Sequence, residues 1–215
     1  MFSVQHAGLS RLRKEPWASQ GAIVLHLLKA GASVSALDKD GRSPLIFAVE
    51  LGHPEVTQYL ISAGADVNLG DKNGTTPLMY ACKEGHLEVC TILLSNGAEA
   101  GATAPGKGSS SIHFAGSGGN PRVVKLLLDA GVQVDTQNGS GDTCLSLAVA
   151  GGKVGLVGWL VEKSGARLDI LDKEGRSCLD LAALMLTLNK EDASRKVILD
   201  YLKKKVKRAQ CLIEA

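Results

Sequence analysis

Few stretches of the 215-residue chain combine residue types that could do chemistry. The segment "GATAPGKG", Gly101 to Gly108, approaches a phosphate-binding loop, in which backbone N–H groups cradle phosphates and a lysine reaches them. Such a loop needs Ser or Thr directly after the lysine to hold magnesium, and here Gly108 occupies that position. It also needs a preceding buried strand. We therefore expect a flexible turn here rather than a nucleotide site.

The histidines raise the question of metal binding or nucleophilic catalysis. His53 and His86 lie 33 positions apart, but no Cys or His cluster has zinc-site spacing. His113 and Ser111 are close in sequence, yet no third group completes a triad. Structural hydrogen bonds explain all three histidines more simply. The sequence therefore predicts no catalytic residue, cofactor, metal site or small-molecule substrate, and we expect the protein not to be an enzyme.

The five cysteines are an odd number, which argues against a disulfide framework. Cys144 and Cys178 hold equivalent positions in neighbouring units of the repeat described below. Packed helices lie about 8–10 Å apart, beyond the ~7 Å that a disulfide can bridge between Cα atoms. Free thiols and a reducing, intracellular compartment are expected. The same reasoning leaves a pairing of Cys82 with Cys90 open.

A unit of 33 residues recurs along the chain. The segment "DKDGRSPLIFAVELGHPEVTQYLISAGADVN", from Asp38, aligns with "DKNGTTPLMYACKEGHLEVCTILLSNGAEAG", from Asp71. Glycine, proline and histidine recur 33 positions apart, in the pairs Gly41/Gly74, Pro44/Pro77, Gly52/Gly85, His53/His86 and Gly64/Gly97. A fixed period of this length is typical of stacked repeat proteins.

Each unit predicts two short antiparallel helices and a projecting turn. Gly41 suits a turn that needs a positive φ. Ser43 and Pro44 are typical of a helix N-cap and a first helical residue, and Gly52 is typical of a helix end. Pro54 then opens a second helix. A unit of this size cannot bury its own apolar faces, so it must stack on its neighbours.

This pattern resembles the ankyrin-repeat family. The resemblance rests on "DGRSPLIFA…GHPEV…LISAGADVN" and "NGTTPLMYA…GHLEV…LLSNGAEA", with less regular copies in "SSIHFAGSGGNPRVVKLLLDAGVQVD" and "GDTCLSLAVAGGKVGLVGWLVEKSGARLD". It implies an all-α solenoid of about six helix-turn-helix units with β-turn fingers. The expected units are 1–37 (partial N-terminal cap), 38–70, 71–103, 104–137, 138–171 and 172–215 (C-terminal cap with a basic helical tail). Unit four carries one extra residue, and unit five has one before Gly165.

Composition excludes several partner classes. The formal net charge of +2 gives no global basic field for nucleic acid. The stretch from Cys144 to Val161 has the length of a membrane helix and a single charge, Lys153. Gly151 and Gly152 fall at the turn between two repeat helices, so we expect no membrane span. We also expect a monomer.

The resemblance implies a non-catalytic protein–protein interaction module, a scaffold or an adaptor. In the ankyrin family, partners usually meet the turn tips and the exposed side of the first helices, which form a continuous concave face. Carried over position by position, this face in units two and three comprises Lys39, Asp40, Arg42, Glu50, Leu51, Lys72, Asn73, Thr75, Tyr80, Lys83 and Glu84. Arginine and tyrosine are favoured hot-spot residues. Affinity is therefore expected to concentrate on Arg42 and Tyr80, whereas Phe47 and Phe114 are assigned to packing between repeats.

The matching positions in units four and five carry mostly small residues. They admit two interpretations, close approach of a peptide backbone or no contact at all. These positions are Lys107, Ser109, Ser117, Gly118, Gly139, Ser140, Asp142, Ala150 and Gly151. Unit six restores charge with Lys173, Glu174 and Arg176.

Two further features concern localisation and modification. The basic run "KKKVKR", Lys203 to Arg208, is either the solvated face of the last helix or a short nuclear import signal. It supports an alternative function, a targeting or regulatory part of a larger signalling or transcription protein, cytoplasmic or nuclear. Asn68 ends "LISAGADVN", which resembles sequences that asparaginyl hydroxylase modifies in ankyrin proteins; the alternative is an ordinary turn asparagine.

Overall fold

The computed structural model describes residue 26 and residues 30–189 and 192–213, with side chains in the last range as far as Lys207. Most of expected unit 1–37 lies outside these residues. The described helices form five consecutive pairs. The first helices of the pairs are α3 (Pro44–Glu50), α5 (Pro77–Glu84), α7 (Ser111–Gly118), α9 (Cys144–Ala150) and α11 (Cys178–Leu188). The second helices are α4 (Pro54–Ser62), α6 (Leu87–Ser95), α8 (Pro121–Asp129), α10 (Val154–Trp159), which continues into the π-helix η1 (Leu160–Ser164), and α12 (Ala193–Ile213).

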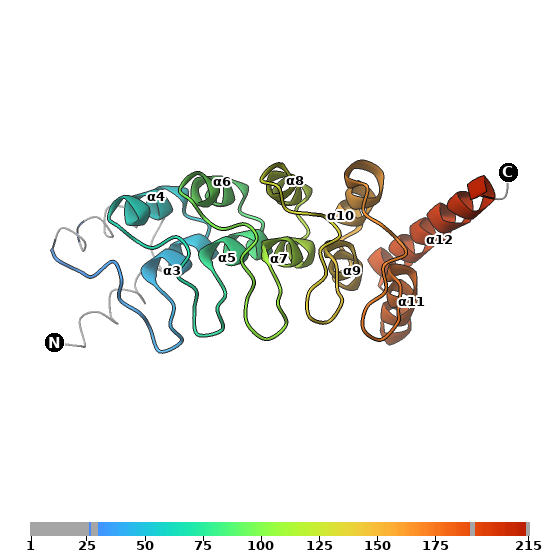
Figure 1. Cartoon of the computed structure of the whole chain (residues 1–215), viewed down its shortest axis with the longest axis horizontal. Coiled ribbons are helices and arrows are strands. Elements are labelled where there is room, and N and C mark those ends of the chain that lie inside the picture. Colours follow the sequence, from blue (N-terminus) through green and yellow to red (C-terminus); the bar gives the residue numbers. More distant parts are fainter. Residues whose placement is uncertain (1–25, 27–29, 190–191, 214–215) are drawn as a thin grey trace.

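The pairs stack side by side into an elongated solenoid (Figure 1). The first helices lie in one row and α4, α6, α8 and α10 in another, and each helix packs on its counterpart in the next unit. Long loops, which we call fingers, precede the first helices and all project from the same side of the stack. The described residues therefore confirm the all-helical repeat fold.

Helices α3 and α4 begin where the sequence predicts, at Pro44 and Pro54. The Ser43 hydroxyl accepts a hydrogen bond from the Ile46 N–H, and Pro44 is the first residue of α3. Thr76 caps α5 and Thr143 caps α9 in the same way. Such caps satisfy N–H groups that have no partner within the helix.

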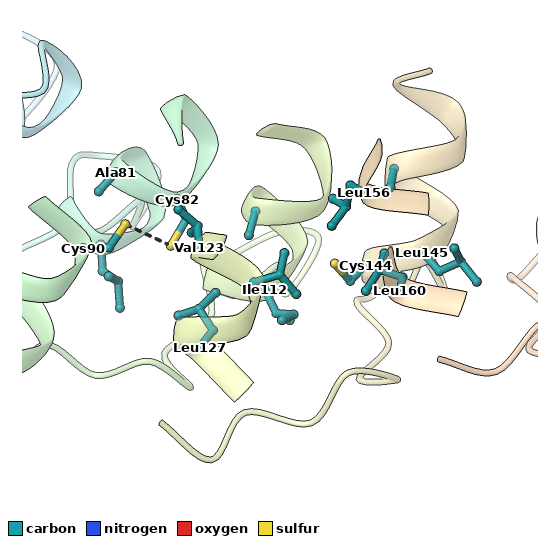
Figure 2. Close-up of a cluster of buried hydrophobic side chains, with 14 of the residues drawn as sticks. Ala81, Cys82, Cys90, Ile112, Val123, Leu127, Cys144, Leu145, Leu156 and Leu160 are labelled. Atoms are coloured by element: carbon teal, nitrogen blue, oxygen red, sulfur yellow. Dashed lines mark hydrogen bonds between the residues drawn. The ribbon is translucent and has the colours of Figure 1, made fainter. Parts of the chain in front are cut away.

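The core runs without interruption along the stack between the two rows of helices. Figure 2 shows part of it, from Cys90 in unit three to Leu160 in unit five. Leu45, Ala48 and Val49 are buried on one face of α3. In α4, Val56 and Leu60 are buried while Ile61 is half-buried. Fully burying one such aliphatic side chain stabilises a fold by about 1.5–3 kcal/mol.

The two inserted residues are absorbed in different ways. In unit five, the extra residue before Gly165 falls where α10 widens into the π-turn η1, which ends at that glycine with a φ of 73°. A single π-turn is the usual way for a helix to accept one additional residue. In unit four, the extra residue lengthens the finger, whose Thr103 and Ser110 form an isolated antiparallel bridge.

The segment Gly101–Gly108 lies in this finger, between α6 and α7. This confirms the turn interpretation of the near-match to a phosphate loop. The stretch from Cys144 to Val161 is likewise divided between α9, α10 and the start of η1. In the described part of the chain, no helix is both long and apolar enough to cross a membrane.

The last helix, α12, closes the stack and then extends past it (Figure 1). Ile198, Leu199 and Leu202 are buried where α12 packs on α10 and α11. Beyond them, Glu162 of η1 accepts a hydrogen bond from the Tyr201 hydroxyl, at 3.1 Å, and lies 3.2 Å from the Lys205 ammonium. These contacts hold α12 against η1 of unit five.

Candidate partner-binding face

An Asp or Asn side chain organises most of the fingers. In units two, three, five and six, the same oxygen of Asp38, Asp71, Asn138 and Asp172 accepts the backbone N–H groups two and four residues further on. A single residue thus fixes the tip of the turn. Unit four departs from the pattern, since Ala104 stands at this position and its N–H donates to the Ser109 carbonyl.

Backbone hydrogen bonds also join neighbouring fingers. The N–H of Lys72 donates to the Asp40 carbonyl, and the N–H of Lys173 donates to the Ser140 carbonyl, both at 3.0 Å. In unit four the position of Lys72 is taken by Pro105, which has no N–H to donate. Its ring instead packs on Gly74, where the Cβ of any larger residue would overlap it. The row of fingers is therefore held together along its length by different contacts.

The structure places the predicted face residues in two groups. Seven are exposed as expected: Lys39, Asp40, Leu51, Lys72, Asn73, Lys83 and Glu84. Four are half-buried: Arg42, Glu50, Thr75 and Tyr80. The two proposed hot spots thus belong to the less accessible group.

Arg42 is held within its own unit. Its guanidinium lies 3.0 Å from the Asp38 carboxylate and 3.7 Å from that of Glu50, and it stacks 4.4 Å above the centre of the Phe47 ring. Its side chain is only 24% exposed. The expectation that Arg42 is a freely exposed position is therefore wrong, because the finger and α3 bring two carboxylates and a ring to it.

Tyr80 is also engaged internally. Its hydroxyl donates a hydrogen bond of 3.0 Å to the second carboxylate oxygen of Asp71, the residue that organises its finger. Burial and this neighbouring carboxylate raise the pKa of Tyr80 to about 12. Its hydrogen bond is therefore already made before any partner arrives, and its side chain is half-buried.

Two glycines of α7 serve the stack itself. At Gly118, the last residue of α7, a Cβ atom would overlap the Lys83 carbonyl oxygen and approach the Cys82 carbonyl oxygen to 2.7 Å. At Gly116 it would approach the Cys144 carbonyl oxygen to 2.6 Å. These glycines let α7 lie close to α5 on one side and α9 on the other, so ligand access is not needed to explain them.

A pocket of about 120 Å³ opens between the fingers and first helices of units four and five. We call it the unit 4–5 pocket. It is lined by Lys107, Ser109, His113, Phe114, Ser117, Asn138, Asp142 and Leu147. The sequence did not predict this pocket, although four of its lining residues are among the mostly small positions noted in units four and five. The available signal was that Ser109 and Ser117 replace the large Arg42 and Glu50 of unit two.

The histidines are structural, as predicted, where their contacts are described. The Nδ1 atom of His113 accepts the Ser110 N–H at 3.1 Å, so its Nε2–H donates to the Thr136 carbonyl at 3.1 Å. His86 contacts the Glu50 carbonyl at 3.2 Å, beneath Gly52. The His53 ring makes no hydrogen bond within the described residues, so the prediction for this histidine stays a prediction. His86 thereby joins unit three to unit two, and His113 ties α7 to Thr136 near the end of its own unit.

The described cysteines are free thiols, as predicted: Cys82, Cys90, Cys144 and Cys178. The sulfurs of Cys82 and Cys90 lie 3.9 Å apart and are not bonded (Figure 2). Burial raises the pKa of Cys144 to about 12, and the Cys90 thiol together with burial raises that of Cys82. Protonated, buried thiols are poor nucleophiles.

Among the residues whose placement is known, no three His, Cys, Asp or Glu side chains form a metal-binding group.

Asn68 bridges units two and three. Its amide nitrogen donates to the Gly97 carbonyl at 3.1 Å, and its amide oxygen accepts the Glu99 N–H at 2.9 Å. Both ends of the amide are therefore used in the stack. Hydroxylation of Asn68 stays a prediction. The test is the mass of the peptide that contains Asn68, from protein made in cells with the hydroxylase. A mass that shows no added oxygen atom would count against the prediction.

Stacked helix pairs, projecting fingers and a first-helix row define a repeat protein of the ankyrin class. The family Ankyrin repeats (3 copies) matches residues 17–104 and 112–207, so the chain belongs to the ankyrin-repeat family. Members of this class are in general non-catalytic protein–protein interaction modules. The chain is also similar to the nuclear factor NF-kappa-B p105 subunit of Gallus gallus, at 35% identity over 165 residues. That match covers 76% of this chain and 14% of the p105 subunit.

Proposed function

We propose that the protein binds a protein partner along the face formed by its fingers and first helices, as a scaffold or adaptor. One observation carries this proposal: neighbouring fingers contact one another in a single row beside the first helices. The contacts are backbone hydrogen bonds or, between units three and four, the packing of Pro105 on Gly74, and the row carries exposed charged residues. A surface that is fixed before binding loses little conformational entropy when a partner docks. The continuity of the row suits an extended segment that spans several units.

The exposed charges of units two and three form the outer contact set in this proposal. Both signs are present: Lys39 and Asp40 at one fingertip, Lys72 at the next, and Lys83 and Glu84 at the end of α5. Such rim charges tune association rate and partner choice more than total affinity. Arg42 and Tyr80 are half-buried behind these charges. Each remains a candidate contact through the exposed part of its side chain.

The test compares proteins captured from cell extract by the wild type and by a Lys72→Glu/Lys83→Glu variant. Both lysines are exposed, so the double change leaves the fold intact, as circular dichroism would verify. The matched control is Lys125→Glu/Lys163→Glu, two exposed lysines on α8 and η1. A partner lost by the face variant and kept by the control supports the proposal. A partner kept by both would place binding on another surface.

A second candidate function is that of a targeting or regulatory part of a larger signalling or transcription protein. The similarity to part of the p105 subunit favours it, as do the exposed Lys203, Lys204 and Lys207 on α12. Lys205 differs from these three because it pairs with Glu162. We expect Lys203→Gln/Lys204→Gln/Lys207→Gln to shift a fluorescent fusion out of the nucleus and Lys205→Gln to shift it less. Unchanged distribution of the triple variant would eliminate this role for the helix.

A further inference from the structure

Unit two shows how the surface formed by a finger and its first helix can bind a cationic side chain. In unit two, the Arg42 guanidinium stacks on Phe47 and pairs with Asp38 and Glu50. Stacking on an aromatic ring combined with a carboxylate is an arrangement that suits the planar guanidinium better than a lysine ammonium. The side chain that fills this place belongs to the same unit.

Unit four keeps the ring but lacks the arginine. Counted from the helix N-cap, Ser109 stands for Arg42, Phe114 for Phe47 and Ser117 for Glu50. On the next unit, Leu147 stands for Tyr80. Three large side chains are thus replaced by two serines and a leucine, and the unit 4–5 pocket occupies the space above the half-buried Phe114.

The pocket also supplies a carboxylate. Asp142 lines it from the fifth finger, and its one side-chain contact within the described residues is a long one, 3.4 Å from the Asn138 amide nitrogen. Arg176 on the next finger is already paired with Asp172 and Glu174, at 2.8 and 2.6 Å. Asp142 is therefore available to a cation that enters the pocket.

The other groups around Asp142 do not replace that cation. Burial lowers the pKa of His113, whose ring nitrogens are both engaged in hydrogen bonds, so this histidine is neutral at pH 7. Lys107 lies on the rim and is exposed. An ammonium on a flexible, hydrated stem does not stack on the ring as a guanidinium does.

We propose that the unit 4–5 pocket receives an arginine side chain of the protein partner, with the guanidinium on Phe114 and paired with Asp142. This arrangement would reproduce in trans what Arg42 does in cis in unit two. The Ser109 and Ser117 hydroxyls offer further acceptors for the outer N–H groups of the guanidinium. The inference rests on the proposed function and adds the side-chain chemistry that the partner must present.

The test is a titration of the isotope-labelled full chain, followed by backbone amide shifts, with the peptide acetyl-Gly-Ser-Arg-Ser-Gly-amide. Matched peptides carry Lys, Gln or Glu in place of Arg. We expect saturable shifts at Ser109, Phe114 and Asp142 with the arginine peptide and weaker ones with lysine. A glutamine peptide that matches the arginine peptide, or a glutamate peptide that exceeds it through Lys107, would overturn the proposal.

Two variants sharpen the result. Asp142→Asn keeps the shape of the pocket and should weaken binding of the arginine peptide about fivefold, as expected for a partly exposed charge pair. Its matched control, Asp129→Asn at the exposed end of α8, should leave binding unchanged. Ser109→Arg refills the pocket from within and should abolish the shifts. If the Arg variant does not fold, the peptide series and Asp142→Asn still decide, and unchanged affinity in Asp142→Asn refutes the proposal.

The same variants separate this inference from the proposed function. A captured partner that is lost by Lys72→Glu/Lys83→Glu but retained by Asp142→Asn and Ser109→Arg would support the face and refute the arginine pocket. A partner retained by every variant would refute the face, and the peptide titration would then judge the pocket alone.

Discussion

Single side chains set the shape of the fingers, and Asp38 shows how. One carboxylate oxygen accepts the N–H groups of Asp40 and Arg42, each at 2.8 Å, and the other pairs with the Arg42 guanidinium. Burial alone would raise the pKa of Asp38, but these backbone N–H groups and the guanidinium outweigh it and lower the pKa. The finger thus depends both on an acceptor and on a charge.

These two contributions are separable by substitution. Asp38→Asn retains the acceptor oxygen and loses the ion pair, so the free energy of unfolding should fall by about 1 kcal/mol or less. Asp38→Ala also leaves two finger N–H groups without their acceptor and should cost about 2–3 kcal/mol. Urea unfolding at pH 7 measures both, and equal losses would contradict the separation. Because the folded pKa is depressed, the carboxylate's contribution is complete above pH 3.8 and disappears as the pH falls through the folded value.

His113 makes stability depend on pH in a milder range. Burial lowers its pKa below 6.5 despite the opposing hydrogen bonds, and protonation of Nδ1 would break its bond from the Ser110 N–H. The unfolded chain therefore binds a proton first, and the free energy of unfolding should decrease as the pH falls below 6.5. Burial lowers the pKa of His53 too, helped by His86. Urea unfolding between pH 5 and 8 should show a shallower slope for His113→Gln than for the wild type; an unchanged slope would mean that His113 does not titrate in this way.

At the scale of helices, the spacing between units depends on where glycine removes a Cβ atom. Gly118→Ala would press a methyl group against two carbonyl oxygens of α5, and overpacking of this kind costs about 1–3 kcal/mol. Gly155 in α10 is the matched control, since nothing lies within 4 Å of its would-be Cβ. Gly155→Ala should stabilise the protein by about 0.5–1 kcal/mol through helix propensity. Thermal unfolding compares the two, and a destabilising effect of both would show that α10 is packed more tightly than its surroundings indicate.

The helices themselves were predictable because their signals are local. Ser43, Pro44 and Gly52 each act on the backbone within a few residues, so a single sequence reveals them. The internal pairing of Arg42 was not predictable from its place in the repeat. It depends on Glu50, which lies close to Arg42 only when α3 has formed. The unit 4–5 pocket exists because large side chains are absent between two units, at Ser109 on the fourth finger and at Leu147 on α9. Such an absence becomes visible only when the units are compared position by position, as when Ser109 is set against Arg42.

At the scale of the whole molecule, stability should be graded along the stack, because each unit contacts only its neighbours. Leu202 is fully buried where α12 closes the C-terminal end. Leu202→Ala should cost about 2–5 kcal/mol, and the loss should act first on α11 and α12. Hydrogen exchange should therefore quicken in these two helices while α5 and α7 keep their protection. Val197→Ala on the same helix is the control, since Val197 is 52% exposed and its loss should change exchange little. Equal acceleration from α3 to α12 would instead show that the described stack unfolds as one cooperative unit, and the partner-binding face would then share its stability with the terminal helix.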